Sequence, residues 1–206
     1  MTEPIMGIDI SHWQEKIDIN LLKNNDGVKF IILKAGGPAY EDSQFEERYK
    51  QCKEAGMPVG CYYYVGKNCT DQISGELDAV RFLNMIEGKQ FEYPIFMDFE
   101  APSPLTRKGN TDAVIAFCDM CESQGYYVGV YASDVSGFVD RLELGRLNAY
   151  DKWVARYSGQ PKVVKKYGMW QYTSKAFLTG VSGRVDCDFA FKDYPTIMIN
   201  NHLNGF

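Results

Sequence analysis

The chain has 206 residues, of which 45% are hydrophobic and 14% aromatic, and its formal net charge is −5 at pH 7. This length and composition fit one globular domain. The negative charge argues against a nucleic-acid partner, because binding to phosphates needs a basic face. No apolar run approaches a membrane span, so no membrane insertion is expected. Residues 1–11 have neither a basic start nor a long apolar stretch, and they do not resemble a secretory signal peptide.

Short strand-like runs alternate with helical patterns over most of the chain. Strands are predicted at 5–11, 28–35, 58–66, 93–100, 126–133, 152–157, 168–173 and 183–191. One helix is predicted after Ser43, which has capping-box spacing to Glu46, and two more at about 71–87 and 111–124. Alternation of this kind predicts parallel strands joined by crossovers.

The fold that these elements predict is an irregular, TIM-like β/α barrel. Eight strands favour a closed barrel over an open sheet, and the last three are too close together for full helices between them. The expectation is therefore five regular β/α units followed by a helix-poor final third. No linker divides the chain, so residues 1–206 are expected to form one domain, with a core at about 5–192 and a C-terminal tail at about 193–206.

The cysteines do not indicate a disulfide framework. A chain of 206 residues with a full core does not need such cross-links. Cys118 and Cys121 form a C-x-x-C, but it lies in a helical pattern and no second pair accompanies it. Reduced, structural thiols are favoured over a redox or zinc site, and neither a metal nor a cofactor is predicted.

The segment "PIFMDFEAPSP" at 94–104 carries two acids at the end of an apolar strand. Side chains alternate along a strand, so Asp98 and Glu100 share one face with Phe96, while Ile95, Met97 and Phe99 share the other. The same parity places Asp9 in the first strand, and Asp186 with Asp188 in the last, on an inward face. Barrels carry their chemistry at the C-terminal ends of the strands, so these acids are expected to meet at the barrel mouth.

A cluster of carboxylates lined with aromatic rings suits glycoside hydrolysis. Burying an ionised carboxylate is costly unless something compensates. One acid, its pKa raised by burial and by like charges, would protonate the leaving oxygen, and another would stabilise positive charge at the sugar carbon. Tyr62, Tyr64 and Tyr131 fit either sugar contacts or packing inside the barrel, and the seventh strand adds Trp170 with Tyr172.

Other interpretations of the same residues stay open. The Asp98 and Glu100 pair could be solvated strand-end carboxylates, and Asp186 with Asp188 could bind a hard cation, although no ligand-rich loop accompanies them. Lys34 could pair with a cleft carboxylate or cap its strand, and His12 is expected at the surface or behind the site. Arg156 is expected in a structural ion pair.

Six segments together resemble the glycoside hydrolase family 25 lysozymes, the Chalaropsis-type muramidases. They are "GIDISHWQEKID" (7–18), "FMDFE" (96–100), "GYYVGVYAS" (125–133), "WVARY" (153–157), "MWQYTS" (169–174) and "GRVDCDFA" (183–190), and the match runs from about residue 5 to 192. The resemblance implies a barrel with modified final strands that cleaves the β-1,4 bond from N-acetylmuramic acid to N-acetylglucosamine in peptidoglycan.

The resemblance also implies roles for individual residues. The family's D-x-E motif falls on Asp98 and Glu100, so Glu100 would be the general acid and Asp98 the stabiliser or the group that orients the N-acetyl. Asp9 and Asp186 would line the cleft and complete the catalytic set. The resemblance also makes Trp170 a substrate platform. The other candidate substrate contacts come from the strand pattern: Tyr62, Tyr64, Tyr131 and Asp188.

The sequence departs from the family's pattern in three ways. Gly36 and Gly37 replace an acidic segment that many members carry, Tyr63 replaces a histidine, and Asp188 replaces the asparagine of V-D-x-N. The missing acid leaves open a barrel glycosidase for another N-acetylated glycan. A non-catalytic glycan-binding barrel is the alternative from another class.

The expected partner is bacterial peptidoglycan, with no obligate protein partner. The tail "INNHLNGF" at 199–206 resembles an exit from the domain toward a wall-binding module outside this chain. The expected place of action is the cell wall. A phage lysin made in the host cytoplasm and a secreted enzyme with its leader removed fit equally well, and the stereochemical course of the reaction is open.

Overall fold

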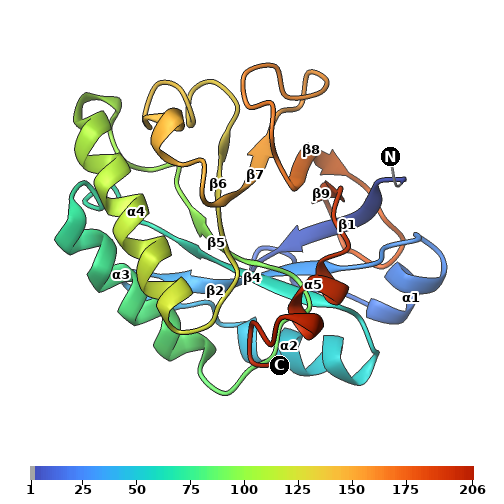
Figure 1. The fold of residues 1–206 in the computed structure, drawn as a ribbon. Helices are drawn as coiled ribbons and strands as arrows, with labels where there is room; N and C mark the ends of the chain where they lie inside the picture. Colours follow the sequence, from blue (N-terminus) through green and yellow to red (C-terminus); the bar gives the residue numbers. More distant parts are fainter. Residues whose placement is uncertain (1–2) are drawn as a thin grey trace.

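Eight strands close into a barrel in the computed structural model, which describes residues 3–206 (Figure 1). Each strand pairs with its neighbour along the chain, and β1 pairs with both β2 and β9, which closes the ring. A two-residue strand, β3 (Tyr40–Glu41), pairs with β2 outside the ring. The barrel strands are β1 (Ile5–Ile10), β2 (Ile31–Gly37), β4 (Val59–Tyr64), β5 (Ile95–Asp98), β6 (Val128–Ser133), β7 (Asp151–Ala155), β8 (Met169–Ala176) and β9 (Val185–Ala190). The predicted α/β barrel is confirmed.

The last strand runs opposite to the rest. Pairings from β1 through β8 are parallel, whereas β9 is antiparallel to both β8 and β1. The connection at 177–184 is too short for a crossover, which needs a dozen residues or more, so the chain turns back as a hairpin. As a result the beginning of β9, not its end, lies at the mouth of the barrel.

Helices cover only the first part of the barrel. They are α1 (Ile19–Asn24), α2 (Phe45–Glu54), α3 (Gln72–Ile86) and α4 (Arg107–Ser123), with the short 3-10 helix η1 (Pro104–Thr106) before α4. Between β6 and β7 the structure has only the 3-10 helix η2 (Leu144–Arg146). The helix-poor part therefore begins one connection earlier than the five predicted units imply.

The helix starts differ in how they are capped. The side chain of Asp71 accepts the backbone N–H of Ser74, and the Ser74 hydroxyl accepts the N–H of Asp71, so α3 begins with a capping box. The predicted box at Ser43 is wrong. Helix α2 begins after Gln44 with no side-chain cap, and Asp42 instead accepts the Gln44 N–H at 3.0 Å.

Two apolar layers follow from the parity of the strands. Ile95, Met97 and Phe99 pack outward against the helices, as predicted. Phe96 and Trp153 belong to a second layer inside the barrel. Because these side chains fill the interior, the inward acids one step further along the strands are left at the mouth.

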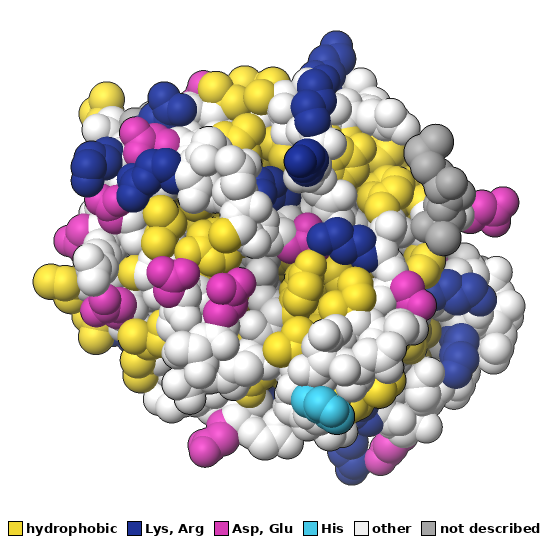
Figure 2. Space-filling model, viewed as in Figure 1, with side chains coloured by type: hydrophobic (Ala, Val, Ile, Leu, Met, Phe, Trp, Pro, Cys, Tyr) yellow, Lys and Arg dark blue, Asp and Glu magenta, His cyan; other side chains and the backbone are white. Residues whose placement is uncertain are grey.

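The C-terminal residues close the opposite end of the barrel. Helix α5 (Tyr194–Asn200), red in Figure 1, packs with Tyr194 and Met198 fully buried. The Asn204 side chain accepts the N–H of Tyr127 at 2.7 Å and donates to the carbonyl of Tyr93 at 2.9 Å. These residues therefore form a floor under the barrel. On the face shown in Figure 2, acidic and basic side chains are interspersed with hydrophobic ones.

Candidate active site

Four of the predicted acids lie at the barrel mouth. Asp9 and Asp186 are direct cross-strand partners on β1 and β9. Asp98 ends β5 and is 5% exposed, and Glu100 follows two residues later with an exposed side chain. Glu100 contributes to the raised pKa values of the other three acids, so all four share one electrostatic environment.

Gln171 connects this group and was not predicted. Its Nε2 donates to Asp9 Oδ2 at 2.8 Å and to Asp186 Oδ2 at 3.2 Å. Its Oε1 accepts from the hydroxyls of Tyr131 at 2.9 Å and Tyr157 at 2.8 Å. The side chain is only 1% exposed and all its hydrogen-bonding groups are used. Gln171 therefore fixes two carboxylates and two tyrosines relative to each other.

Burial is the main cause of the pKa shifts in the cluster. It raises the pKa values of Asp9 and Asp98 well above the ordinary range, and the charges of neighbouring acids add to the effect. Burial followed by the charge of Glu100 raises the pKa of Asp186 to about 6. Such a cluster holds protons at a pH where isolated carboxyl groups have lost them.

Glu100 differs from the others in facing solvent at the rim. The protein around it desolvates the carboxyl group enough to raise its pKa, and the charges of Lys34 and Arg141 act in the opposite direction. Lys34 points into the mouth, with its Nζ 5.0 Å from the ring centre of Tyr64. Among residues 3–206, no carboxylate lies within 4.0 Å of the Lys34 ammonium. Lys34 therefore acts on Asp98 and Glu100 through its field rather than through a close ion pair.

Asp98 has an unused acceptor. Its Oδ1 is buried and has no hydrogen-bond partner among the described residues. Buried polar atoms are nearly always paired in folded proteins, so an exception at a barrel mouth suggests a place for a ligand donor.

Asp188 lies deeper, at the floor of the same cluster. It is fully buried, and its Oδ1 accepts the indole N–H of Trp153 at 2.7 Å. Trp153 also packs against Tyr131, with ring centres 4.5 Å apart, and against Tyr62 at 6.1 Å. Asp188 can therefore influence a ligand only through the residues above it, and the predicted direct contact does not fit its burial.

The predicted aromatic contacts lie in three different places. Tyr62 and Tyr64 are half-buried at the mouth, and the acids there contribute to raising both pKa values after burial. Tyr131 is 9% exposed and bonded to Gln171, so it belongs to the wall of the site. Trp170 lies on the outer surface of the barrel, where its ring is 6.0 Å from that of Phe189. The prediction of Trp170 as a platform in the cleft is therefore wrong.

The parity of β8 explains this correction. Met169 belongs to the barrel interior and Gln171 bonds the inward acids, so Trp170 between them must face outward. Its indole N–H donates to the carbonyl of Arg156 at 2.8 Å. Arg156 in turn pairs with Asp134 at 3.2 Å, as the predicted structural ion pair.

A hairpin occupies the place of the expected acidic segment. Gly36 and Gly37 pair with Glu41 and Tyr40 across β2 and β3. A Cβ on Gly36 would lie 2.6 Å from the carbonyl oxygen of Tyr40, so this close turn requires glycine.

Exposed rings border the mouth beside this hairpin. Tyr40 is 53% exposed and Trp13 is 77% exposed. His12 lies behind them, with its Nδ1 2.7 Å from Asp42 Oδ2, which fixes the loop after β1.

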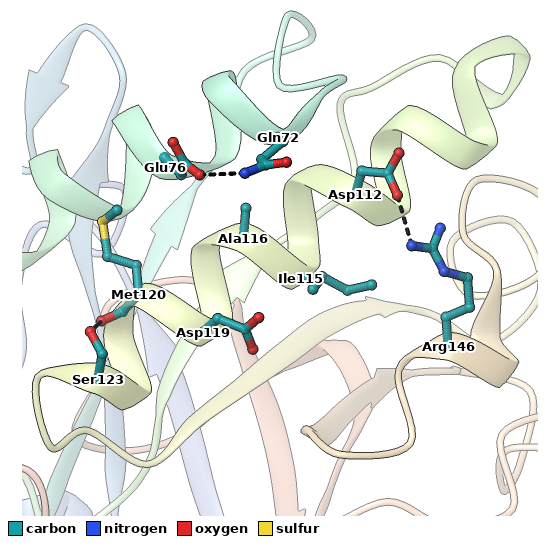
Figure 3. Close-up of a pocket in the computed structure, with 9 residues that line it drawn as sticks. All are labelled: Gln72, Glu76, Asp112, Ile115, Ala116, Asp119, Met120, Ser123 and Arg146. Carbon is teal, nitrogen blue, oxygen red and sulfur yellow. Dashed lines mark hydrogen bonds and ion pairs between the residues drawn. The ribbon is translucent and has the colours of Figure 1, made fainter.

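A cavity on the outer helices is separate from the acids. It has a volume of about 480 Å³ and lies between α3 and α4 (Figure 3). Its polar side chains pair with each other: Gln72 donates to Glu76 at 2.8 Å, and Arg146 donates to Asp112 at 2.7 Å. None of the acids at the barrel mouth lines it.

Three further observations concern the rest of residues 3–206. No group of three or more His, Cys, Asp or Glu side chains is arranged there to hold a metal ion. No helix in this part combines the length and apolar character that a membrane crossing requires. The six cysteines are buried and unbonded, and burial raises the pKa of Cys52 to about 12, which agrees with structural thiols.

Fold and site together define an α/β barrel with an acidic mouth. The chain belongs to glycosyl hydrolases family 25, whose family model matches residues 8–181. It is similar to the autolytic lysozyme of Clostridium acetobutylicum, with 29% identity over 184 residues that cover 88% of this chain and 54% of the relative. The chain therefore spans about half the length of that relative. It is also 28% identical to the uncharacterized protein YegX of Escherichia coli K12, covering 88% of this chain and 68% of YegX.

Solved structures show the same barrel. The CTP1L endolysin has a TM-score of 0.83 at 26% identity, over 95% of this chain and 70% of that one. The modular autolysin LytC from Streptococcus pneumoniae, solved in complex with a synthetic peptidoglycan ligand, has a TM-score of 0.83 at 25% identity, over 93% of this chain and 47% of LytC.

Proposed function

We propose that this chain hydrolyses the β-1,4 bond between N-acetylmuramic acid and N-acetylglucosamine in bacterial peptidoglycan, with Glu100 as the general acid. The observation that carries the proposal is the meeting of Asp9, Asp98, Glu100 and Asp186 at one barrel mouth, where their pKa values are raised. Family membership, a relative named autolytic lysozyme and the peptidoglycan-bound LytC support the same substrate.

Glu100 is suited to protonate the leaving oxygen. It is the exposed member of the cluster, so a glycan lying across the mouth can reach it. Its raised pKa keeps a proton available at mildly acidic pH, which is the property a general acid needs. Once the bond breaks, the same carboxylate can take a proton from the attacking water.

Asp98 is suited to orient the substrate. Its buried and unpaired Oδ1 can accept a hydrogen bond from the N–H of an N-acetyl group. Asp9 and Asp186, held by Gln171, supply negative charge where positive charge develops at the sugar carbon. Tyr62 and Tyr64 border the same space and are proposed to contact the sugar rings.

Clearing of purified cell walls tests the role of Glu100. Wild type is expected to reduce the turbidity of a wall suspension, and Glu100→Gln is expected to reduce the rate at least about 100-fold, since it keeps the shape but not the transferable proton. Glu76→Gln is the matched control, because it makes the same chemical change in the outer α3–α4 cavity. Equal clearing by Glu100→Gln would contradict the assignment.

The alternatives give different outcomes in the same assay. A barrel glycosidase for another N-acetylated glycan would leave walls intact but cleave that glycan, with the same dependence on Glu100. A glycan-binding barrel would sediment with walls and release no fragments. The proposed place of action is the bacterial cell wall, the location of this substrate.

A further inference from the structure

Asp188 is a fully buried acid in an unusual environment. Groups from four strands face it or lie next to it: Asp9 from β1, Asp186 from β9 itself, Gln171 from β8 and the Trp153 indole from β7. None of these groups carries a positive charge. A buried, ionised carboxylate without a cationic partner is strongly unfavourable.

The hydrogen-bonding environment of Asp188 also argues against an ionised carboxylate. Its Oδ1 accepts the Trp153 N–H at 2.7 Å, but its Oδ2 is buried without a donor among the described residues. An ionised carboxylate can only accept, so Oδ2 would be left unsatisfied. A protonated Oδ2 can donate, and the inward Asp9 carboxylate on the adjacent strand β1 can accept.

We propose that Asp188 is a neutral carboxylic acid that donates its Oδ2 proton to Asp9, and that it is a positioning residue for Asp9. Burial, with the charge of Asp9 next, raises the pKa of Asp188 well above its ordinary value, in agreement with this assignment. The hydrogen bond from Asp188 lowers the pKa of Asp9, whereas burial raises it.

This arrangement holds Asp9 from two sides. Gln171 Nε2 donates to Asp9 Oδ2 at 2.8 Å, and Asp188 donates from below. A neutral acid at position 188 offers the same pair of groups as asparagine, an acceptor for Trp153 and a donor for Asp9. The substitution of the family's V-D-x-N asparagine by aspartate therefore need not add a charge to the floor of the site.

The stability of Asp188→Asn against pH tests the proton directly. A carboxyl group whose pKa is higher in the folded chain than in the unfolded chain stabilises the fold fully only below the unfolded value, which is about 3.8 for aspartate. That contribution is lost as the pH rises toward the folded pKa. We therefore compare the folding equilibrium constants of wild type and Asp188→Asn as the pH rises from about 4. The ratio of wild type to variant should fall by up to a factor of about 10 per pH unit.

Asp140→Asn is the matched control, because Asp140 is exposed and the chemical change is identical. Its stability difference from wild type should stay nearly constant over the same pH range. A difference for Asp188→Asn that is equally constant from pH 4 to 8 would overturn the proposal. A second readout is the ¹³C carboxyl resonance of Asp188 in protein labelled at its aspartates. It is assigned as the signal that the Asp188→Asn spectrum lacks. It should keep its protonated position at pH 7, and titration near the ordinary value would also overturn the proposal.

The positioning role rests on the proposed function and has its own test. Asp188→Asn keeps a donor for Asp9, whereas Asp188→Leu has a similar size and none. Wall-clearing activity of Asp188→Asn should exceed that of Asp188→Leu at least tenfold, and equal activity would exclude the positioning role. If Asp188→Leu does not fold, the stability and resonance measurements still decide the protonation of Asp188. These two measurements need no substrate, so a failure of the muramidase proposal would be distinguishable from a failure of the proposal for Asp188.

Discussion

Asp98 combines deep burial with little compensation from neighbouring groups. It is 5% exposed, its Oδ1 has no partner, and the field of Lys34 is the only cationic influence among the causes of its pKa shift. The proposed function gives the Oδ1 atom a partner, the N–H donor of a bound ligand.

We therefore expect Asp98→Asn to lower kcat/KM about 10–100-fold, because the carboxyl acceptor is replaced by an amide that can present its NH2 group to the ligand N–H. The thermal midpoint should not fall, because the amide keeps the size of the side chain and cannot carry a buried charge. Kinetics on soluble peptidoglycan fragments and thermal unfolding of the same preparations provide the check. A variant that loses stability and activity together would show that Asp98 is structural.

The alternation of side chains along strands predicted the inward position of several site residues from the sequence, but the prediction failed for β8. Asp9 lies between Ile8 and Ile10, and an acid flanked by aliphatic side chains can face only one way in a barrel. In β8 both faces mix apolar and polar side chains, so the sequence offers no such anchor. Trp170 was therefore predicted to face inward, and the bridging role of Gln171 was missed. The register that pairs Gln171 with the inward Asp188 of β9 shows that Gln171 faces inward and Trp170 outward. This register is known only from the structure.

Helices α3 and α4 pack directly against each other. A Cβ on Gly75 would lie 2.1 Å from the carbonyl oxygen of Ala113, a backbone atom that cannot move aside by changing rotamer. Glycine is required here because the two helices approach closely.

Gly75→Ala should therefore destabilise the protein by about 1–3 kcal/mol through overpacking, after allowance for the better helix propensity of alanine. Gly145→Ala is the control, since a Cβ there would meet nothing within 4 Å. Urea unfolding of both variants measures the difference. If Gly75→Ala is as stable as Gly145→Ala, the helices are not in this close contact.

The lengths of the connections between strands explain which parts of the topology could be predicted from the sequence. Long helical segments after β2, β4 and β5 give parallel crossovers, which the sequence indicated. The hairpin direction of β9 follows from an equally simple rule, because its connection is too short for a crossover. Residues 134–150 are long enough for a helix but contain turns and η2 instead, and their pattern has no apolar period that distinguishes these outcomes.

At the scale of the whole molecule, the C-terminal residues hold the floor of the barrel. Asn204 is fully buried, has a φ of 55°, and bonds the backbone of Tyr93 and Tyr127 just before β5 and β6. A polar segment such as 199–206 resembles a tail in sequence, because one buried asparagine cannot be distinguished from exposed ones by composition.

Asn204→Ala should cost about 1–3 kcal/mol for each backbone group left without its partner. Asn201→Ala is the control, because its side chain is exposed and bonds only to the Ile197 carbonyl within its own helix. Thermal unfolding of the two variants should show a large decrease for position 204 and little change for 201. Similar midpoints would mean that the floor does not contribute to the stability of the barrel.

The chemical identity of the new reducing ends tests the central claim most directly. Purified peptidoglycan is digested, the fragments are reduced with borohydride, and the reduced sugars are identified after acid hydrolysis. The account predicts reduced muramic acid from wild type and none above background from Glu100→Gln. Reduced glucosamine from wild type, or equal release by Glu100→Gln, would contradict it.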